Sequence, residues 1–228
     1  CPRKKSWRAR YTKDSKTLDS YKGDRPVDED KSKALSAQLK LAREILQAGG
    51  YLCPITKSFE ADDLIGTIAK RFGRLGYKVI IYSRDKDFVQ CLNSFVIIVR
   101  QAQANSAEQI ITAQNAHEFY VKPKQMIDFL TMVGDSSDCV AGINGKGEKT
   151  AKAILEKYGS IDAARDQSFP RFEKLSNEFF EDTRMLVTID TNAPNVPKHI
   201  KEFRPPVKEK VLKRIKKELR FNYLISGV

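Results

Sequence analysis

The sequence predicts an α/β sheet flanked by helices, followed by a region built of helices alone. Two apolar, β-branched segments at 78–83 and 95–99 alternate with helical patterns, which is typical of a mostly parallel sheet. Beyond about residue 112 the chain shows only helical periodicity. We therefore expect an α/β part at 1–125 and a helical part at 126–228.

The α/β part contains two amphipathic helical patterns. Apolar residues at helical spacing predict a helix over 31–48, which the glycine pair at 49–50 ends. A second apolar stripe predicts a helix over 61–75, with Gly76 as its stop. Between the two helices, the apolar segment 51–55 is a candidate short strand.

The helical part is divided by the same kind of pattern. Four prolines between residues 191 and 206 predict a connecting loop, and the helix that follows this loop is amphipathic and basic. Helices are expected at 126–133, at 149–158, over most of 171–189 and at 207–219.

Positive charge is concentrated at the two ends of the chain. The 228 residues carry 41 Lys plus Arg and 29 Asp plus Glu, a net charge of +12. Residues 1–26 and 201–220 each hold nine cationic and three acidic residues, and together they account for this excess. Such segments favour nucleic acid as a partner, although a solubilising surface is the plain alternative. Trp7 and Tyr11 lie among the first group of cations, where aromatic rings could stack on bases.

The composition argues against several protein classes. No run of about 18 apolar residues is present, so no membrane span is expected, and the first residues lack the apolar core of a signal peptide. The four cysteines are scattered and only two histidines occur, which argues against a zinc site or a disulfide framework. We expect a protein of the reducing cytoplasm that has no membrane partner.

Acidic residues form three clusters at the ends of predicted elements. The first opens the helix at 61–75, where acids also serve as ordinary caps. The second follows the strand at 78–83, at the kind of strand end where α/β proteins bind ligands, although an acidic loop is an ordinary alternative. The third follows the helix at 126–133 and could instead cap the next helix. The members are Glu60, Asp62 and Asp63 in the first cluster, Asp85 and Asp87 in the second, and Asp135 and Asp138 in the third.

Gathered at one place, these seven carboxylates would repel one another unless cations compensated them. Carboxylates and water suit Mg²⁺ or Mn²⁺. Two such ions about 4 Å apart would activate a water molecule and stabilise the leaving oxygen of a phosphodiester. Combined with the basic ends, the clusters indicate a nuclease.

The glycine-rich segment 142–150 separates two predicted helices. Its spacing resembles a P-loop, but Glu148 intrudes before Lys149, and a helix rather than a strand precedes it. A nucleotide-dependent enzyme built on this turn is a weaker hypothesis. We favour a helix-hairpin-helix turn that contacts a duplex phosphate through helix-end amides, with a turn that binds nothing as the alternative. The residues expected to contact DNA are Gly142, Gly145, Lys146, Gly147, Lys149 and Thr150.

In this order, the motifs resemble the flap endonuclease and 5′-nuclease family, which includes the 5′-nuclease domain of bacterial DNA polymerase I and stand-alone phage 5′-3′ exonucleases. The resemblance covers most of the chain. It implies a PIN-like sheet core followed by a helix-hairpin-helix (H3TH-like) region that binds DNA. The matching segments are 21–26, 60–63, 85–87, 126–130 and 134–151.

The resemblance implies a hydrolase that cleaves DNA at 5′ single-strand/duplex junctions, as a 5′-3′ exonuclease or flap endonuclease, by a two-metal-ion mechanism. It implies that the first acidic cluster binds one ion, that the second lies near the shared centre, and that the third forms the outer site. Lys22 and Arg25 match an arch-like basic stretch, and Lys22 is the better candidate to stabilise transition-state charge. Mg²⁺ is the expected ion with Mn²⁺ as a substitute, and K⁺ is a further expectation at the 142–147 turn.

Some features depart from the family pattern. Members begin with a strand that ends in Asp, and a second Asp precedes the segment that resembles 7–25; neither is present. We therefore expect a chain that is incomplete at its N-terminus by several dozen residues. A module that binds branched DNA without cutting it is the alternative function. Cys139 stands where many members have Asn, and Arg84 stands where many have Gly; we expect both departures to be tolerated. We also expect the protein to be a monomer.

Overall fold

The computed structural model describes residues 6–13, 20–23, 28–104, 106–167, 169, 172 and 175–219. The chain divides into two compact units, each made of two stretches of sequence. This division follows contacts, whereas the division predicted at residue 125 follows the change from mixed to helical patterns. Unit 1 comprises Cys1–Arg25 and Thr56–Pro194, and unit 2 comprises Pro26–Ile55 and Asn195–Val228.

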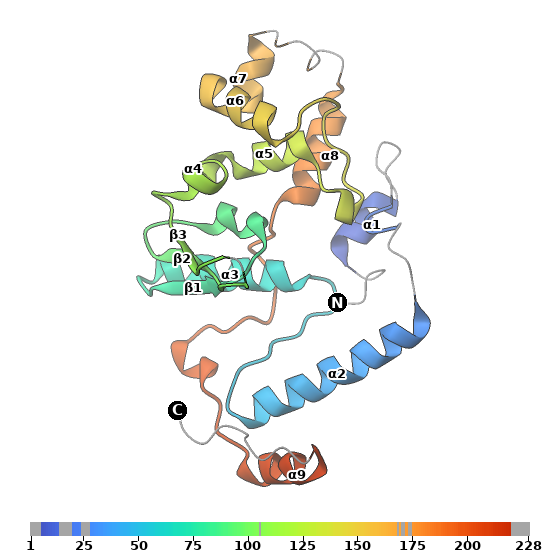
Figure 1. Cartoon of the computed structure of the whole chain (residues 1–228), viewed down its shortest axis with the longest axis vertical. Coiled ribbons are helices and arrows are strands. Elements are labelled where there is room, and N and C mark those ends of the chain that lie inside the picture. The colour runs from blue at the N-terminus through green and yellow to red at the C-terminus, as the bar shows by residue number, and fades with distance from the viewer. Residues whose placement is uncertain are drawn as a thin grey trace. The chain divides into compact units, whose positions relative to one another are not determined.

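Unit 1 contains a three-stranded sheet in the order β1-β2-β3 (Figure 1). β1 (Val79–Tyr82) and β2 (Val96–Arg100) run parallel, as predicted from their β-branched runs. β3 (Gln109–Ile111) joins β2 in the antiparallel direction. Three residues are too few to show a period, which is why the sequence patterns did not reveal β3.

One helix connects the sheet with the acidic clusters. α3 (Ala61–Arg74) packs against β1 and against the 3-10 helix η2 (Lys86–Cys91), which follows β1 closely in the chain. The apolar stripe of α3 supplies the buried side chains of Leu64, Ala69 and Phe72. Because the start of α3 and the end of β1 both carry acids, this packing decides where two of the three clusters lie.

The rest of unit 1 is helical, in agreement with the predicted change of pattern. α5 (Met126–Val133) packs against both α6 (Glu148–Tyr158) and α8 (Asn177–Val187), and its Met126, Phe129 and Leu130 are fully or almost fully buried. The predicted helix at 171–189 is confirmed over its second part. The elements are α1 (Trp7–Lys13), α4 (Ala116–Phe119), η3 (Pro123–Gln125), α5 (Met126–Val133), η4 (Ser136–Asp138), α6 (Glu148–Tyr158), α7 (Ile161–Asp166) and α8 (Asn177–Val187).

Unit 2 is built on α2 (Glu29–Ala48) and α9 (Glu209–Leu219), which pack against each other, with η5 (Ile200–Phe203) before α9. The carboxylate of Asp28 accepts a hydrogen bond from the Lys31 amide at 3.0 Å and so caps the start of α2. Both helices were expected from apolar periodicity, and each begins within two residues of its predicted start.

The strand predicted at 51–55 is wrong. The backbone amide of Tyr51 bonds to the Leu46 carbonyl at the end of α2, and residues 51–55 have no strand partner among the described residues. An isolated apolar run cannot form a strand, because the ladder hydrogen bonds require a neighbour. Tyr51 and Ile55 are exposed accordingly. Within the described part of the chain, no helix has the length and apolar character to cross a membrane.

Candidate functional site

Members of all three acidic clusters meet at one small cavity of about 20 Å³ in unit 1. Asp62 comes from the first turn of α3, and Asp87 comes from η2 after β1. Asp135 and Asp138 come from the segment between α5 and α6. The other residues that line the cavity are Arg8, Tyr21, Val140, Leu186, Val187 and Ile189. The tertiary structure therefore brings four of the seven predicted carboxylates to one place.

The cavity is short of positive charge. Burial, followed by the charges of Asp85 and Asp135, raises the pKa of Asp87 to about 7. Burial also raises the pKa of Asp62, although the charge of Arg8 opposes the rise. The Oδ1 atom of Asp87 is buried without a hydrogen-bond partner among the described residues. An unpaired carboxylate oxygen in an acidic cavity is what a hard cation would satisfy.

The donor type suits a divalent ion, but the side chains do not form a closed shell. In the described segments, no three Asp, Glu, His or Cys side chains are grouped closely enough to hold a metal ion as they stand. Asp135 accepts hydrogen bonds from the Ser137 amide and hydroxyl at 2.8 and 2.7 Å, and Asp85 accepts one from the Asp87 amide at 2.9 Å. Asp85 and Asp135 therefore cap the short helices that follow them, as the alternative interpretation predicted for Asp135, and this does not exclude a role in binding an ion.

A lysine and a tyrosine connect the first and third clusters. The Lys22 Nζ atom lies 2.9 Å from Glu60 and 3.4 Å from Asp138. The Tyr21 hydroxyl lies 3.0 Å from the same Glu60 oxygen and 2.8 Å from Asp138, and its burial raises its pKa strongly. The Lys22 amide also donates to the Asp138 carbonyl at 2.9 Å, with Lys22 in a left-handed conformation at φ 56°. The predicted Lys22 is thus at the site, whereas Arg25 lies outside the described residues.

Two left-handed residues shape the loop that carries the third cluster. Gly134 has φ 72° and Cys139 has φ 57°. Asp135 and Val140 exchange two backbone hydrogen bonds of 2.9 and 2.8 Å, which close the loop between them. Asn tolerates this conformation better than other side chains, so the departure at Cys139 falls where Asn has a conformational advantage.

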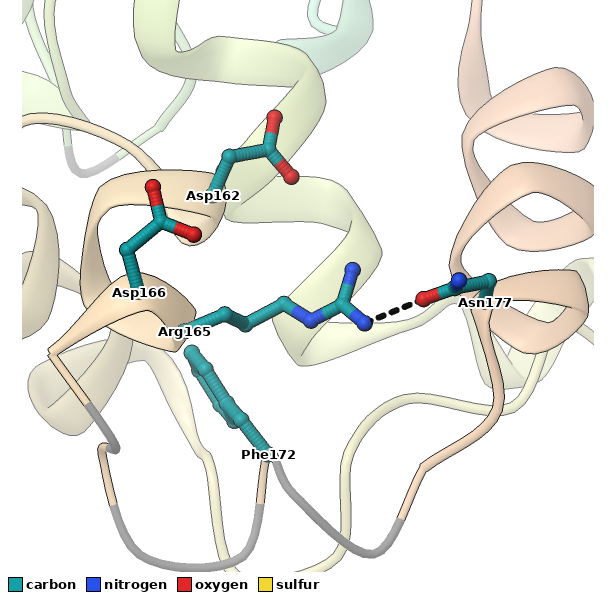
Figure 2. Close-up of a pocket in the computed structure, with 5 residues that line it drawn as sticks. All are labelled: Asp162, Arg165, Asp166, Phe172 and Asn177. Atoms are coloured by element: carbon teal, nitrogen blue, oxygen red, sulfur yellow. Dashed lines mark hydrogen bonds between the residues drawn. The ribbon is translucent and has the colours of Figure 1, made fainter.

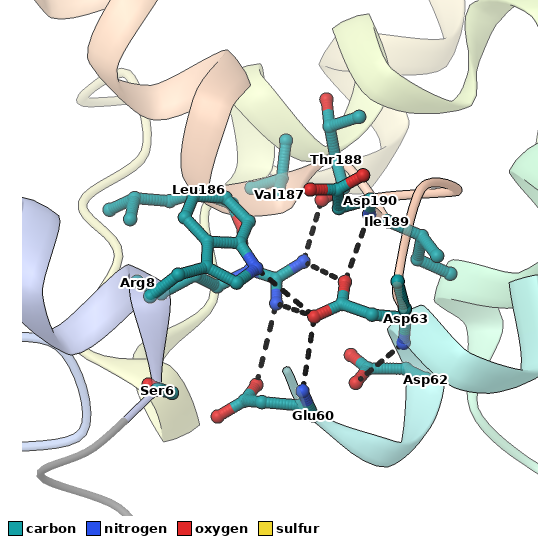
Figure 3. Close-up of polar contacts among 12 residues, drawn as sticks. Ser6, Arg8, Glu60, Asp62, Asp63, Leu186, Val187, Thr188, Ile189 and Asp190 are labelled. Atoms are coloured by element: carbon teal, nitrogen blue, oxygen red, sulfur yellow. Dashed lines mark hydrogen bonds and ion pairs between the residues drawn. The ribbon is translucent and has the colours of Figure 1, made fainter. Parts of the chain in front are cut away.

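Asp63 and the two aromatic residues of α1 are placed differently from the expectation. Asp63 is fully buried and is bound by Arg8 and Trp7 rather than facing the cavity (Figure 3). The Tyr11 hydroxyl donates to Asp182 at 2.6 Å, and this bond raises the pKa of Tyr11 to about 12. Trp7 and Tyr11 therefore use their polar atoms within the protein. Arg8 and Tyr21 were not predicted as residues of the site, although each lies in a segment that the sequence analysis singled out.

The glycine-rich segment is a turn between α5 and α6, which excludes the strand-loop-helix context of a P-loop. A Cβ atom on Gly142 would lie 2.4 Å from the Val133 carbonyl oxygen, so the backbones approach too closely for a side chain. Gly147 is the N-cap residue of α6, and a Cβ atom there would meet nothing within 4 Å. With Lys149 and Thr150 exposed beside it, the turn presents helix-end amides and a cation at its surface.

Lys146 is buried, although it was expected on the surface of the turn. The residue is only 9% exposed, and its Nζ atom lies 4.4 Å from the centre of the Phe169 ring and 5.9 Å from that of Phe172. A cation over two aromatic faces is stabilised by the quadrupoles of the rings. Lys146 therefore ties the turn to the aromatic residues behind it.

Gly145→Ala is expected to lower the free energy of unfolding by about 1–2 kcal/mol, because Gly145 has φ 74° and an L-residue is strained there. Gly147→Ala serves as the matched variant, because its φ of −66° suits alanine and the space around it is open. Chemical denaturation of both variants and the parent measures the difference. Equal losses at the two positions would contradict the turn geometry.

A larger cavity of about 400 Å³ lies between α7 and α8 (Figure 2). Its Arg165 bonds to Asn177, and the guanidinium lies 4.4 Å from the centre of the Phe180 ring. Asp162 and Asp166 also line it, so two acids accompany the one cation among the residues that line it, and this cation is already engaged within the protein. None of the residues singled out in the sequence lines this cavity, and the smaller acidic cavity is the candidate site.

Comparisons with known proteins identify the family. A family model described as the 5′-3′ exonuclease N-terminal resolvase-like domain matches residues 5–121, and one described as the 5′-3′ exonuclease C-terminal SAM fold matches residues 121–211. A 5′-3′ exonuclease of Aquifex aeolicus is 36% identical over 169 residues, 74% of this chain and 55% of that protein. DNA polymerase I of Bacillus subtilis is 32% identical over 219 residues, 92% of this chain and 24% of that protein.

Solved structures share the fold. The T5 D15 protein, co-crystallised with metal ions, has a TM-score of 0.66 at 22% identity and covers 93% of this chain and 80% of its own. The catalytic core of Rad2 in complex with DNA has a TM-score of 0.55 at 18% identity and covers 85% of this chain and 65% of its own. This chain spans about half the length of the Aquifex exonuclease and about a quarter of the polymerase. The two family models together match most of the chain, which therefore belongs to the 5′-3′ exonuclease family.

Proposed function

We propose that this chain is the nuclease part of a metal-dependent enzyme that hydrolyses DNA phosphodiesters at 5′ single-strand/duplex junctions, as a 5′-3′ exonuclease or flap endonuclease. The observation that carries the proposal is the meeting of Asp62, Asp87, Asp135 and Asp138 at one cavity beside Lys22. Family membership supports the reaction type. The T5 5′-exonuclease binds divalent zinc, and a variant of the T5 D15 flap endonuclease was crystallised with DNA and metal ions.

The four cavity carboxylates would hold Mg²⁺, with Mn²⁺ as a substitute, and the unpaired Oδ1 atom of Asp87 supports this choice of a hard cation. Two bound ions would supply a water molecule of lowered pKa and stabilise the leaving oxygen. Glu60 and Asp85 lie at the border of the site, because Glu60 reaches it through Lys22 and Asp85 is exposed.

Among the described residues, Lys22 is the cation that would meet the scissile phosphate. Its Nζ atom is already held at the acidic cavity, and its side chain is 15% exposed. A fixed cation at the place where negative charge develops stabilises the transition state without reorganisation. Tyr21 keeps Glu60 and Asp138 close to each other, and so fixes the two carboxylates between which Lys22 lies.

Duplex binding is assigned to the turn before α6. The exposed Gly145, Gly147, Lys149 and Thr150 would contact a phosphate through backbone amides and one lysine charge, and the turn could also hold K⁺ through its carbonyls. Lys146 supports this surface from behind. Contacts of this kind read no sequence, which suits an enzyme that recognises a junction.

The test uses the full-length protein with a labelled 5′-flap, a blunt duplex and a single strand, in Mg²⁺ and in chelator. The expected result is Mg²⁺-dependent product from the flap in preference to the other two substrates. Binding that weakens steeply with salt is expected in both conditions. Flap binding without product at any Mg²⁺ or Mn²⁺ concentration would overturn the enzymatic proposal and support a module that only binds branched DNA.

A further inference from the structure

We propose that Arg8 and Asp63 form a buried ion pair that positions the metal-binding carboxylates, and that Asp63 itself is not a ligand. The resemblance groups Asp63 with Glu60 and Asp62 as ligands of one ion. The contacts around Asp63 point to a different role for it. The inference rests on the proposed function for its catalytic consequence, but its main measurement needs no nuclease activity.

The carboxylate of Asp63 is saturated by donors from the protein (Figure 3). Its Oδ1 atom accepts hydrogen bonds from Arg8 Nη2 and from the Asp190 amide, both at 2.9 Å. Its Oδ2 atom accepts from Arg8 Nη1 at 2.9 Å and from Trp7 Nε1 and the Glu60 amide at 3.1 Å. A carboxylate offers about four lone-pair sites, so five donors leave none for an ion. The side chain is also 0% exposed.

Arg8 is satisfied to the same degree. Besides the two bonds to Asp63, its Nε atom donates to the Leu186 carbonyl at 2.9 Å, and Nη2 donates to the Thr188 carbonyl at 2.6 Å. Its Nη1 atom also lies 3.7 Å from the Oε2 atom of Glu60, and the guanidinium lies 4.4 Å from the centre of the Trp7 ring. Burial lowers the pKa of Arg8, but the hydrogen bond to Asp63 and the charges of Asp63 and Asp62 together outweigh burial, so the pKa is raised. The arginine is therefore charged, 2% exposed and fully engaged.

This pair joins three parts of unit 1 that are distant in sequence. Arg8 belongs to α1, Asp63 belongs to the first turn of α3, and residues 186–190 leave the end of α8. Arg8 and the side chains of Leu186, Val187 and Ile189 line the acidic cavity. The ion pair therefore connects the walls of the cavity to one another.

The pair also fixes the turn that carries the ligands. Because Asp63 accepts from the Glu60 amide, the chain from Glu60 to Asp63 is closed into the start of α3. Asp62, which precedes Asp63, is left to face the cavity, and its Oδ1 atom accepts from the Asp63 amide at 3.1 Å. A shift of Asp63 would therefore move both Glu60 and Asp62. Residues that orient ligands in this way change metal affinity typically 10–100-fold.

The two roles predict opposite behaviour in chelator, where no metal is bound. If Asp63 is the partner of buried Arg8, Asp63→Asn leaves the arginine charge with only the more distant Glu60 at 3.7 Å, and the unfolding midpoint is expected to fall by roughly 10 °C. If Asp63 were instead a ligand that only repels the neighbouring acids, its replacement would leave the unfolding midpoint unchanged or raise it. Asp62→Asn, a ligand in the proposed function, is the matched control and is expected to leave the midpoint unchanged or raised.

The experiment measures thermal unfolding in chelator and Mn²⁺ affinity at a temperature where each variant is folded. Arg8→Lys, which loses the two-pronged contact, is expected to lower the midpoint as Asp63→Asn does, and to weaken Mn²⁺ binding about 10–100-fold although Arg8 cannot be a ligand. The double variant is expected to lose less than the two single losses added together. Trp7→Phe removes one donor and keeps an aromatic ring, so it gives a milder fall of the midpoint and of Mn²⁺ affinity if the other variants fail to fold.

A midpoint of Asp63→Asn in chelator equal to that of the parent would overturn the inference, and so would Mn²⁺ binding that Arg8→Lys and Trp7→Phe leave unchanged. Either result would leave flap cleavage untouched as evidence for the proposed function. Absence of flap cleavage by the parent, with the midpoints ordered as expected, would remove only the proposed function. The two failures are therefore distinguishable.

Discussion

Asp87→Asn is expected to reduce flap cleavage by about 1000-fold or more and, at the same time, to stabilise the protein in chelator at pH 8. Asp87 supplies the buried oxygen that has no hydrogen-bond partner among the described residues, so it is the carboxylate with most to gain from an ion. A metal ion contributes several kcal/mol of transition-state stabilisation, and losing that contribution corresponds to a rate loss of this size. The same substitution removes a buried charge that other acids repel.

The expected stabilisation by Asp87→Asn depends on pH, because the pKa of Asp87 differs between the folded and unfolded states. The pKa of Asp87 is about 7 in the folded protein and about 3.9 in an unfolded chain. Between these values the folded state keeps a proton that the unfolded state has lost, so the unfolding free energy of the parent falls as pH rises from about 4 to about 7. Asp87→Asn lacks this fall. Its advantage therefore grows through that window and is complete above pH 7, at a few kcal/mol.

Denaturant titrations in chelator at pH 4, 6 and 8, with single-turnover flap cleavage in Mg²⁺, measure both effects. Asp166→Asn is the matched control, because Asp166 is an exposed acid of α7 outside the candidate site. It is expected to change neither quantity by much. Cleavage by Asp87→Asn at the rate of the parent would show that this carboxylate does not hold a catalytic ion.

Lys22→Ala is expected to slow single-turnover cleavage by about 100–1000-fold, the range for loss of one fixed group that stabilises transition-state charge. Lys22 and alanine are equally disfavoured at φ 56°, so the substitution adds no backbone strain. The loss is expected mainly in the rate at saturating enzyme, because an interaction that strengthens in the transition state contributes little to binding.

The control for Lys22 is Lys13→Ala, an exposed lysine at the end of α1. A general attraction to phosphates would make both variants weaken flap binding alike and lose activity only at high salt. A specific role makes Lys22→Ala slow at low salt with binding retained, while Lys13→Ala cleaves normally. Equal behaviour of the two variants would therefore contradict the role of Lys22.

Local patterns were sufficient for most helices and for two strands. The stripes that predicted α2, α3, α5, α6 and α9, and the β-branched runs of β1 and β2, report a period that a few neighbouring residues impose on themselves. The three acidic clusters were visible for the same reason, since each is a short run. That the clusters meet at one cavity was an expectation that no local pattern could establish, because their meeting depends on the packing of α3 against β1 and η2.

Two of the misplaced residues, Asp63 and Lys146, take partners far along the chain. Asp63 looks like a ligand in its own segment, and its pairing with Arg8 spans 55 residues. Lys146 looks like a surface cation of a turn, but the aromatic rings that cover it come from residues 169 and 172. The 51–55 run has the composition of a strand, and it finds no strand partner within the described part of the chain.

By itself, the sequence determined most helices and two of the three strands, the order of the acidic motifs and, through that order, the family. The tertiary structure alone decided which acids share a cavity, which one is consumed by an arginine, and which lysine faces outward. The physical reason is that backbone periodicity is a local property, whereas burial and charge pairing depend on surfaces that meet only after folding.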